Sequence, residues 1–175
     1  MRYTALDFET ANRLRTSACA IGLSVCEEGA EVGHFYTLIR PEPCEFDWFC
    51  TRVHGIGERD VQDAPTFAEI YPLIAPMLAG DIVCHNAPFD IGCLKALCDA
   101  YGLEKPQAEV HCTLKLARRL VPGKSHRLDA VAEHFGLGGF RHHNALDDAR
   151  ICAGIFGRFI MEIGDSVRDH SSRIG

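Results

Sequence analysis

The segment RYTALDFET (residues 2–10) predicts the first β-strand, because its side chains alternate between two faces. Two more segments with strand composition follow it, SACAIGLSV (17–25) and HFYTLIR (34–40). The turn-rich segment CEEGAEVG (26–33) joins these two. We therefore predict an antiparallel meander of three strands, with the first strand at the centre of the sheet.

The rest of the chain alternates between helical and strand patterns. PTFAEIYPLIAPMLAG (65–80) predicts a helix with Thr66 and Glu69 in capping-box spacing, bent or shortened by its prolines. The further elements that we predict are strands at DIVCH (81–85) and EVHCT (109–113), and helices over 86–102, 113–120, 127–135 and about 145–163. This order predicts an α/β fold in which helices flank one five-stranded mixed sheet.

Length and composition indicate one globular domain over residues 1–175. The chain is 47% hydrophobic, which is enough for one sizeable core. It contains no run of about 18 apolar residues, and Arg2, Asp7 and Glu9 interrupt any signal peptide, so we expect a cytoplasmic protein without a membrane segment. The nine scattered cysteines contain no C-x-x-C pair and are expected to be buried free thiols.

The net charge of -6 argues against nucleic-acid binding by overall charge alone, yet one region is basic. Residues 113 to 143 contain six Lys and Arg but only two acidic residues, which gives this segment a net charge of +4. A solvated surface and a phosphate-binding strip both explain such a run. The basic residues of this strip are Lys115, Arg118, Arg119, Lys124, Arg127 and Arg141.

Three carboxylates are placed by local patterns so that they converge. Asp7 and Glu9 project from the same side of the first strand, with Cα atoms roughly 6.6 Å apart. Asp90 lies in the first turn of the helix that Asn86 can cap, on the stripe predicted to face the sheet. It could also serve only as a partner of the helix dipole.

The stretch RHHNALDDAR (141–150) offers two histidines and two aspartates. Helical phase places Asp148 roughly 40° from the centre of the apolar face of the last helix, and Asp147 roughly 140° away. Asp147 then lies toward solvent in the turn capped by Asn144, whereas Asp148 points inward. Four inward carboxylates repel one another and must bind protons or hard cations such as Mg²⁺ or Mn²⁺.

The sequence resembles the DnaQ-like, or DEDDh, family of 3′–5′ exonucleases, which includes the proofreading subunit of bacterial DNA polymerase III. The resemblance rests on LDFETAN, VHGIGERDVQDAPTFAEI, CHNAPFD, HCTLKLARRL and HNALDDA, in this order. The family motif H-x-A-x-x-D-A fits only from His143 to Ala149. It implies a ribonuclease-H-like fold and hydrolysis of the last phosphodiester at a 3′ end, releasing nucleoside 5′-monophosphates.

The resemblance also implies roles for residues. Asp7, Glu9, Asp90 and Asp148 would hold two divalent ions, Mg²⁺ or Mn²⁺, and His143 would act as the general base. The residues expected to border the terminal nucleotide are Thr10, His54, Asn86 and Phe89. We interpret His142 as a surface residue, and Trp48 as a packing residue rather than a nucleotide platform.

The expected substrate is a single-stranded DNA 3′ end. Two alternatives remain, an RNA-directed exoribonuclease of the same family and a nucleic-acid-binding module without catalysis. The motifs do not separate DNA from RNA, because they address metal and phosphate rather than the 2′-hydroxyl. A DNA polymerase is a candidate partner. Since the sequence ends soon after the last helix, such a partner is expected to bind the body of the domain.

Overall fold

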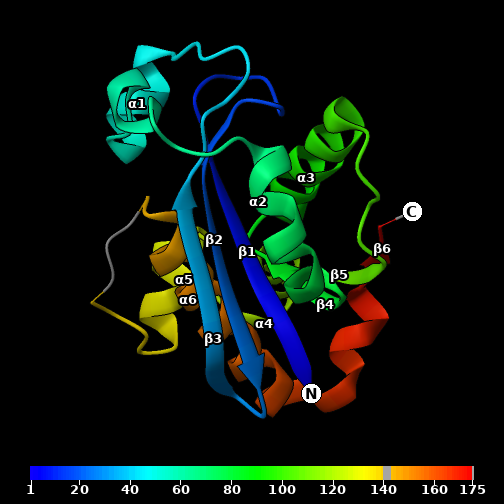
Figure 1. Cartoon of the computed structure of the whole chain (residues 1–175). Helices are drawn as coiled ribbons and strands as arrows, with labels where there is room; N and C mark the ends of the chain where they lie inside the picture. Colours follow the sequence, from blue (N-terminus) through cyan, green and yellow to red (C-terminus); the bar gives the residue numbers. More distant parts are fainter. Residues whose placement is uncertain (140–142, 175) are drawn as a thin grey trace.

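The computed structural model describes residues 1–139 and 143–174 (Figure 1). Arg141, assigned to the basic strip, and His142, predicted to be a surface residue, lie outside the described residues. Twelve α-helices and β-strands occur in the described part of the chain. They are β1 (Arg2–Thr10), β2 (Ala18–Glu27), β3 (Ala30–Leu38), α1 (Trp48–His54), α2 (Phe67–Ile74), β4 (Gly80–Cys84), α3 (Ala87–Tyr101), β5 (Ala108–Cys112), α4 (Thr113–Leu120), α5 (Leu128–His134), α6 (Ala145–Ile163) and β6 (Ser172–Arg173).

The strands form one mixed sheet in the order β3-β2-β1-β4-β5-β6. The predicted meander is confirmed, because β1, β2 and β3 pair antiparallel, while β4 and β5 join in parallel. The prediction of five strands is wrong. After α6 and a 3₁₀ helix (Gly164–His170), the chain returns to the edge of β5, where Ser172–Arg173 pairs antiparallel. A two-residue strand carries too little alternation to be recognised in a sequence.

Each face of the sheet carries its own core. Leu6 and Phe8 of β1 pack toward α2 and α3, whereas Tyr3 and Ala5 pack toward α4, α5 and α6 (Figure 1). The alternation predicted for the first strand is therefore confirmed. Because Asp7 and Glu9 continue the odd-numbered series, they fall on the face that α6 covers.

Local signals explain most helix boundaries. The capping box of α2 is confirmed, since the Glu69 carboxylate accepts hydrogen bonds from the Thr66 N–H (2.7 Å) and hydroxyl (2.9 Å). Helix α2 ends at Ile74, and a 3₁₀ helix (Ala75–Leu78) with Pro76 in its first turn follows. The predicted helix over 65–80 is therefore shortened, as expected from its prolines. The cap predicted at Asn86 is only positional: Asn86 adopts a left-handed conformation (φ 77°) and its side chain makes no capping hydrogen bond.

All nine cysteines are free thiols, and seven of them are buried. Cys44 and Cys50 are partly exposed, so the expectation of burial is wrong at these two positions. Cys44 precedes α1 and Cys50 lies in it, and no residue of this short helix is fully buried. None of the helices in the described part of the chain is both long and apolar enough to cross a membrane.

Candidate active site

Strand β1 and helix α3 place three carboxylates at one end of the sheet. Asp7 and Glu9 lie on the α6 face near the end of β1. Asp90, in the first turn of α3, is 1% exposed and accepts a hydrogen bond from the backbone N–H of Phe8 at 3.1 Å. This bond fixes the Asp90 carboxylate against the strand that carries the other two.

Helix α6 supplies the fourth carboxylate. The side chain of Asn144 accepts a hydrogen bond from the Asp147 N–H at 3.2 Å, so the predicted cap is confirmed. Asp148 is buried, with 5% exposure, while Asp147 is partly exposed. The backbone N–H of His143 donates to Asp148 Oδ2 at 3.0 Å and ties the histidine to this carboxylate. The inward placement that helical phase predicted for Asp148 is therefore confirmed.

A glycine of β2 allows α6 to reach the sheet. Gly22 pairs with Asp7, and a β-carbon at this position would lie 2.2 Å from the carbonyl atoms of Ala145. Only glycine permits the backbone of the first turn of α6 to lie this close to the strand. Gly22 thus brings His143 and Asp148 to the carboxylates of β1. The role of Gly22 was not predicted from the sequence, because a single glycine inside a strand pattern signals only a bulge or a close approach.

The carboxylates of the site resist being ionised together. Burial, followed by the neighbouring carboxylates of Asp90, Glu9 and Asp148, raises the pKa of Asp7. Burial and then Asp148 raise the pKa of Glu9 to about 7. Burial is also the main cause that raises the pKa of Asp90 to about 8, against the lowering effect of the Phe8 N–H. Groups that resist ionisation together are stabilised by a cation placed among them.

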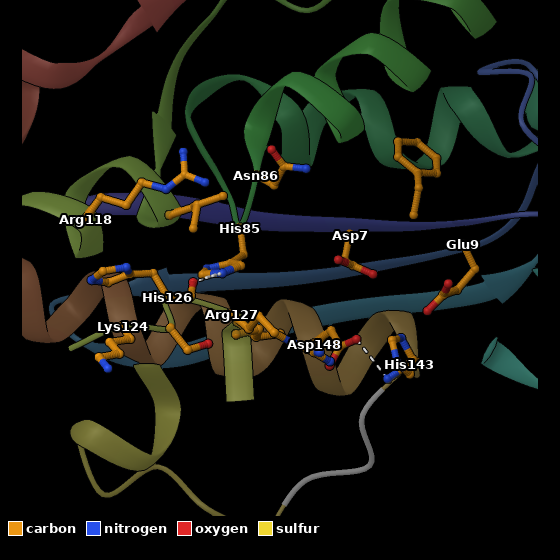
Figure 2. Close-up of a pocket in the computed structure, with 14 residues that line it drawn as sticks. Asp7, Glu9, His85, Asn86, Arg118, Lys124, His126, Arg127, His143 and Asp148 are labelled. Carbon is orange, nitrogen blue, oxygen red and sulfur yellow. Dashed lines mark hydrogen bonds between the residues drawn. The ribbon is translucent and has the colours of Figure 1, made fainter. Parts of the chain in front are cut away.

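The donor atoms fit a divalent cation. Among the described residues, Glu9, His143 and Asp148 offer ligand atoms that all lie within 4.8 Å of one another. Carboxylate oxygens are the ligands that Mg²⁺ and Mn²⁺ prefer. Asp7 adds a carboxylate at the same end of the pocket (Figure 2). The site therefore has the composition of a hard-cation site.

The four groups open into a pocket of about 580 Å³ (Figure 2). Basic side chains also line this pocket, namely Arg118, Lys124 and Arg127. Figure 2 shows Glu9 and His143 at one end of the pocket and Arg118 and Lys124 at the other. One cavity thus combines a cluster of acidic oxygens with cationic side chains, a combination suited to a phosphodiester and its metal ions.

The residues expected to border a nucleotide lie around this end of the sheet, but only Asn86 lines the pocket itself. The His54 Nδ1 atom accepts from the Ile56 N–H (3.1 Å), so its Nε2–H donates to the Thr10 carbonyl (3.2 Å). Phe89 is 37% exposed, and the Arg15 guanidinium lies 5.7 Å from its ring centroid.

Trp48 is not a packing residue, and that prediction is wrong. Its side chain is 69% exposed at the start of α1, and the neighbouring Phe49 is 61% exposed. The Asp47 side chain caps this short helix through the Phe49 N–H, and the Asp47 N–H donates to the Ala11 carbonyl. Capping chemistry, rather than burial of the aromatic residues, therefore determines where α1 begins.

Comparison with known proteins agrees with this geometry. The family model RNase_T, described as exonuclease, matches residues 4–156. The chain is 35% identical over 164 residues to a PolC-type DNA polymerase III of Thermotoga petrophila, covering 90% of this chain and 12% of that protein. It is 31% identical over 170 residues to the DNA polymerase III subunit epsilon of Escherichia coli K12, covering 89% and 70%, respectively.

Solved structures show the same fold. Exonuclease X in complex with 5′ overhanging duplex DNA superposes with a TM-score of 0.77 and 27% identity over 96% of each chain. The nuclease domain of 3′hExo, a DEDDh family member bound to rAMP, superposes with a TM-score of 0.79 at 18% identity, covering 94% of each chain. The chain spans only 12% to 22% of the length of the first curated relatives, which are much larger proteins.

Sequence and structure lead to the same assignment. The matched segment contains β1, α3 and the first part of α6, the three elements that carry the four carboxylates. The chain belongs to the RNase_T exonuclease family, whose DEDDh-type members are 3′–5′ exonucleases and hence hydrolases.

Proposed function

We propose that this chain is a single exonuclease domain over residues 1–175 that removes nucleotides from the 3′ end of single-stranded DNA as nucleoside 5′-monophosphates. The observation that carries this proposal is the convergence of three carboxylates and one histidine in the pocket, with the Asp90 carboxylate held against the same strand by the Phe8 N–H. No other described cluster of the chain combines such a set of donors. The five residues are Asp7, Glu9, Asp90, His143 and Asp148.

The carboxylates would hold two divalent cations, Mg²⁺ or Mn²⁺. When bound, such ions supply Lewis-acid polarisation of the phosphodiester and neutralise the charge that develops on it. The raised pKa values of Glu9 and Asp90 support this assignment, because both groups gain from a nearby cation. Asp90 would contribute from behind the strand, where the Phe8 N–H orients it.

His143 would take the proton from the attacking water. Its backbone is anchored to Asp148, and its ring lies at the open rim of the pocket beside Glu9 (Figure 2). An imidazole with an unperturbed pKa near 6.5 accepts a proton readily at neutral pH. General-base catalysis of this kind contributes roughly 10²- to 10⁴-fold to a rate.

The terminal nucleotide would lie beside Thr10, His54, Asn86 and Phe89. His54 joins α1 to the end of β1 through the Thr10 carbonyl, so this wall stands next to Glu9. Phe89 offers a partly exposed ring for packing against a base. A preference for DNA is supported by the relatives, which include a DNA polymerase III subunit epsilon and Exonuclease X in complex with duplex DNA.

The direct test uses 5′-labelled single-stranded DNA and RNA of matched sequence, with Mg²⁺, with Mn²⁺ and with chelator. We expect a ladder that shortens from the 3′ end, is lost with chelator and forms faster on DNA. Faster shortening of RNA would overturn the DNA preference. Cleavage of a circular substrate would overturn the exonuclease proposal.

A matched pair of histidine variants tests the proposed base. His143→Gln should lower kcat by roughly 10²- to 10⁴-fold. His34→Gln should leave kcat unchanged, because His34 lies on β3 and bonds to Glu31, away from the pocket. An equal loss in both variants would remove His143 from the role of general base.

A DNA polymerase partner and a cytoplasmic site of action complete the proposal. They are supported by the similarity to DNA polymerase III subunits of bacteria. Co-elution of the purified chain with the polymerase subunit of its own cell on size-exclusion chromatography is the expected result. Separate elution at micromolar concentration would contradict a stable partnership.

A further inference from the structure

The basic side chains of the pocket have no assigned role in the chemistry above. Arg118 extends from α4, while Lys124 and Arg127 come from the loop between α4 and α5 (Figure 2). All three line the cavity that contains Asp7, Glu9 and Asp148. Three cations beside the catalytic carboxylates stand out in a chain with a net charge of -6.

Among the described residues, these cations have few acidic partners. No described carboxylate lies within ion-pair distance of Arg118 or Lys124, whereas Arg127 reaches only Asp129 at 3.6 Å. The Arg127 side chain is 71% exposed, and an exposed pair of this kind contributes little to stability. The charges remain available for an anionic ligand.

The loop that carries Lys124 and Arg127 is fixed in place. His85, at the end of β4, contacts the Thr113 hydroxyl at 2.9 Å and the His126 carbonyl at 3.0 Å. The His126 ring in turn contacts the Val121 carbonyl at 3.0 Å. These bonds hold the loop against the ends of β4 and β5, so the cations keep a defined position relative to the carboxylates.

The structure divides the basic strip of the sequence into two groups. Arg118, Lys124 and Arg127 line the pocket, but Arg119 on the same helix turns away and contacts His170 Nδ1 at 3.0 Å. Lys115 lines a different cavity beside His170. Arg118, Lys124 and Arg127 therefore share a cavity with the carboxylates, whereas Lys115 and Arg119, which carry the same charge, do not.

We infer that Arg118, Lys124 and Arg127 bind the phosphate backbone of the nucleotides on the 5′ side of the scissile bond. This inference rests on the proposed function. The terminal nucleotide is proposed at the Glu9 end, beside Thr10 and His54. The remaining strand would then pass Arg127 and leave by the opposite end of the pocket, where Arg118 and Lys124 lie (Figure 2). Contacts to phosphate are independent of base sequence, and therefore this surface serves any single strand.

A binding experiment tests the surface without catalysis. The affinity for a fluorescent 12-nucleotide DNA is measured by anisotropy in chelator at several salt concentrations. The slope of log K against log salt should become shallower by about 0.7 for each phosphate contact removed, hence by about 1.4 in the double variant Arg118→Gln/Lys124→Gln. Arg119→Gln, with the same loss of charge as Arg118→Gln, should leave the slope unchanged. Equal slopes in all variants would overturn the inference.

A kinetic experiment separates the inference from the proposed function. On a 12-nucleotide substrate, we expect kcat/KM to fall about tenfold for each of Arg118→Gln and Lys124→Gln, mainly through KM. On the p-nitrophenyl ester of thymidine 5′-monophosphate, which has no upstream phosphate, kcat/KM should be unchanged. Equal losses on both substrates would place these cations at the terminal nucleotide and overturn the inference. A wild-type chain that hydrolyses neither substrate would instead overturn the proposed function.

Discussion

Asp147 and Asp148 are neighbours in the chain with opposite environments. Asp148 is 5% exposed and accepts the His143 N–H, whereas Asp147 is partly exposed and its own N–H donates to the Asn144 cap. The same kind of side chain is therefore a buried carboxylate at position 148 and a partner of the helix N-terminus at position 147.

Asn substitutions distinguish the two residues. Asp148→Asn should lower kcat by at least about 10²-fold, because it removes a charge that would stabilise the metal ions. Asp147→Asn should keep kcat near the wild-type value and cost about 0.3–1 kcal/mol of stability through the helix dipole. Steady-state rates and thermal unfolding of both variants check this. If the two variants exchanged these effects, the frame that starts at His143 would be wrong.

The crowded carboxylates predict an unusual dependence of stability on pH. Glu9 and Asp90, with pKa values raised to about 7 and about 8, keep protons in the folded state that the unfolded chain releases above about pH 4. In chelator, the contribution of these two protons to the free energy of unfolding therefore falls as pH rises from 5 to 8, by several kcal/mol. Mn²⁺ should raise the unfolding temperature more at pH 8 than at pH 5.

The comparison with Asp90→Asn isolates this term. His54 acts in the opposite direction, because burial lowers its pKa and its stabilising contribution is gained as pH rises. The difference in unfolding free energy between wild type and Asp90→Asn removes that contribution. The variant should gain stability relative to wild type as pH rises toward 8. A constant difference across pH 5–8 would contradict strained ionisation at Asp90.

At the scale of elements, the site depends on how closely α6 approaches β2. Gly22 faces the backbone of Ala145 and Leu146, where an added β-carbon would lie 2.2–2.4 Å from main-chain atoms. Main-chain atoms of a helix cannot yield as a flexible side chain does. The position of Asp148 relative to Asp7 is therefore set by a residue that has no chemistry of its own.

Replacing this glycine should separate the two halves of the site. Gly22→Ala is expected to lower kcat at least about tenfold, since displacements of about 1 Å are costly in active sites. It should also cost about 1–3 kcal/mol of stability by overpacking. Gly33→Ala is the matched control, because a β-carbon on Gly33 of β3 would meet nothing within 4 Å. Rates measured below the unfolding temperature of each variant check the prediction, and a wild-type kcat for Gly22→Ala would contradict it.

At the scale of the whole molecule, the last residues close the edge of the sheet. Strand β6 pairs with β5, the Ile174 N–H donates to the Ala108 carbonyl at 3.1 Å, and Arg168 bonds to Asp81 at 3.0 Å. Ile174 is 3% exposed, while the Arg173 side chain is 83% exposed. The closure covers the start of β5, away from the carboxyl ends of the strands where the pocket lies.

Edge closure therefore predicts a loss of stability without a loss of catalysis. Ile174→Ala should cost about 2–5 kcal/mol, because it empties a buried position, and kcat should stay close to the wild-type value. Arg173→Ala should change the free energy of unfolding by less than about 0.5 kcal/mol. Urea denaturation and rates at low temperature check both variants. An equal stability for the two variants would show that the burial of Ile174 at this edge adds nothing to the stability of the fold.

The sequence by itself determined the parts of the molecule that follow local periodicity. Strand alternation placed Asp7 and Glu9 on one face, and helical phase separated Asp148 from Asp147. The capping box at Thr66 and the cap at Asn144 followed from short-range hydrogen bonding. Each of these depends on residues a few positions apart, and a sequence displays such relations directly.

The tertiary structure decided what depends on contacts between distant segments. Gly22 contacts Ala145, which is more than a hundred residues away in the sequence. Trp48 is exposed, and its exposure depends on which distant segments pack against α1. The sixth strand exists because the chain after α6 reaches β5. Arg118 and Arg119 have equal charge in the sequence, and only the packing of α4 turns one toward the pocket and the other toward His170. Long-range packing carries no local period, so it is fixed only when the chain folds.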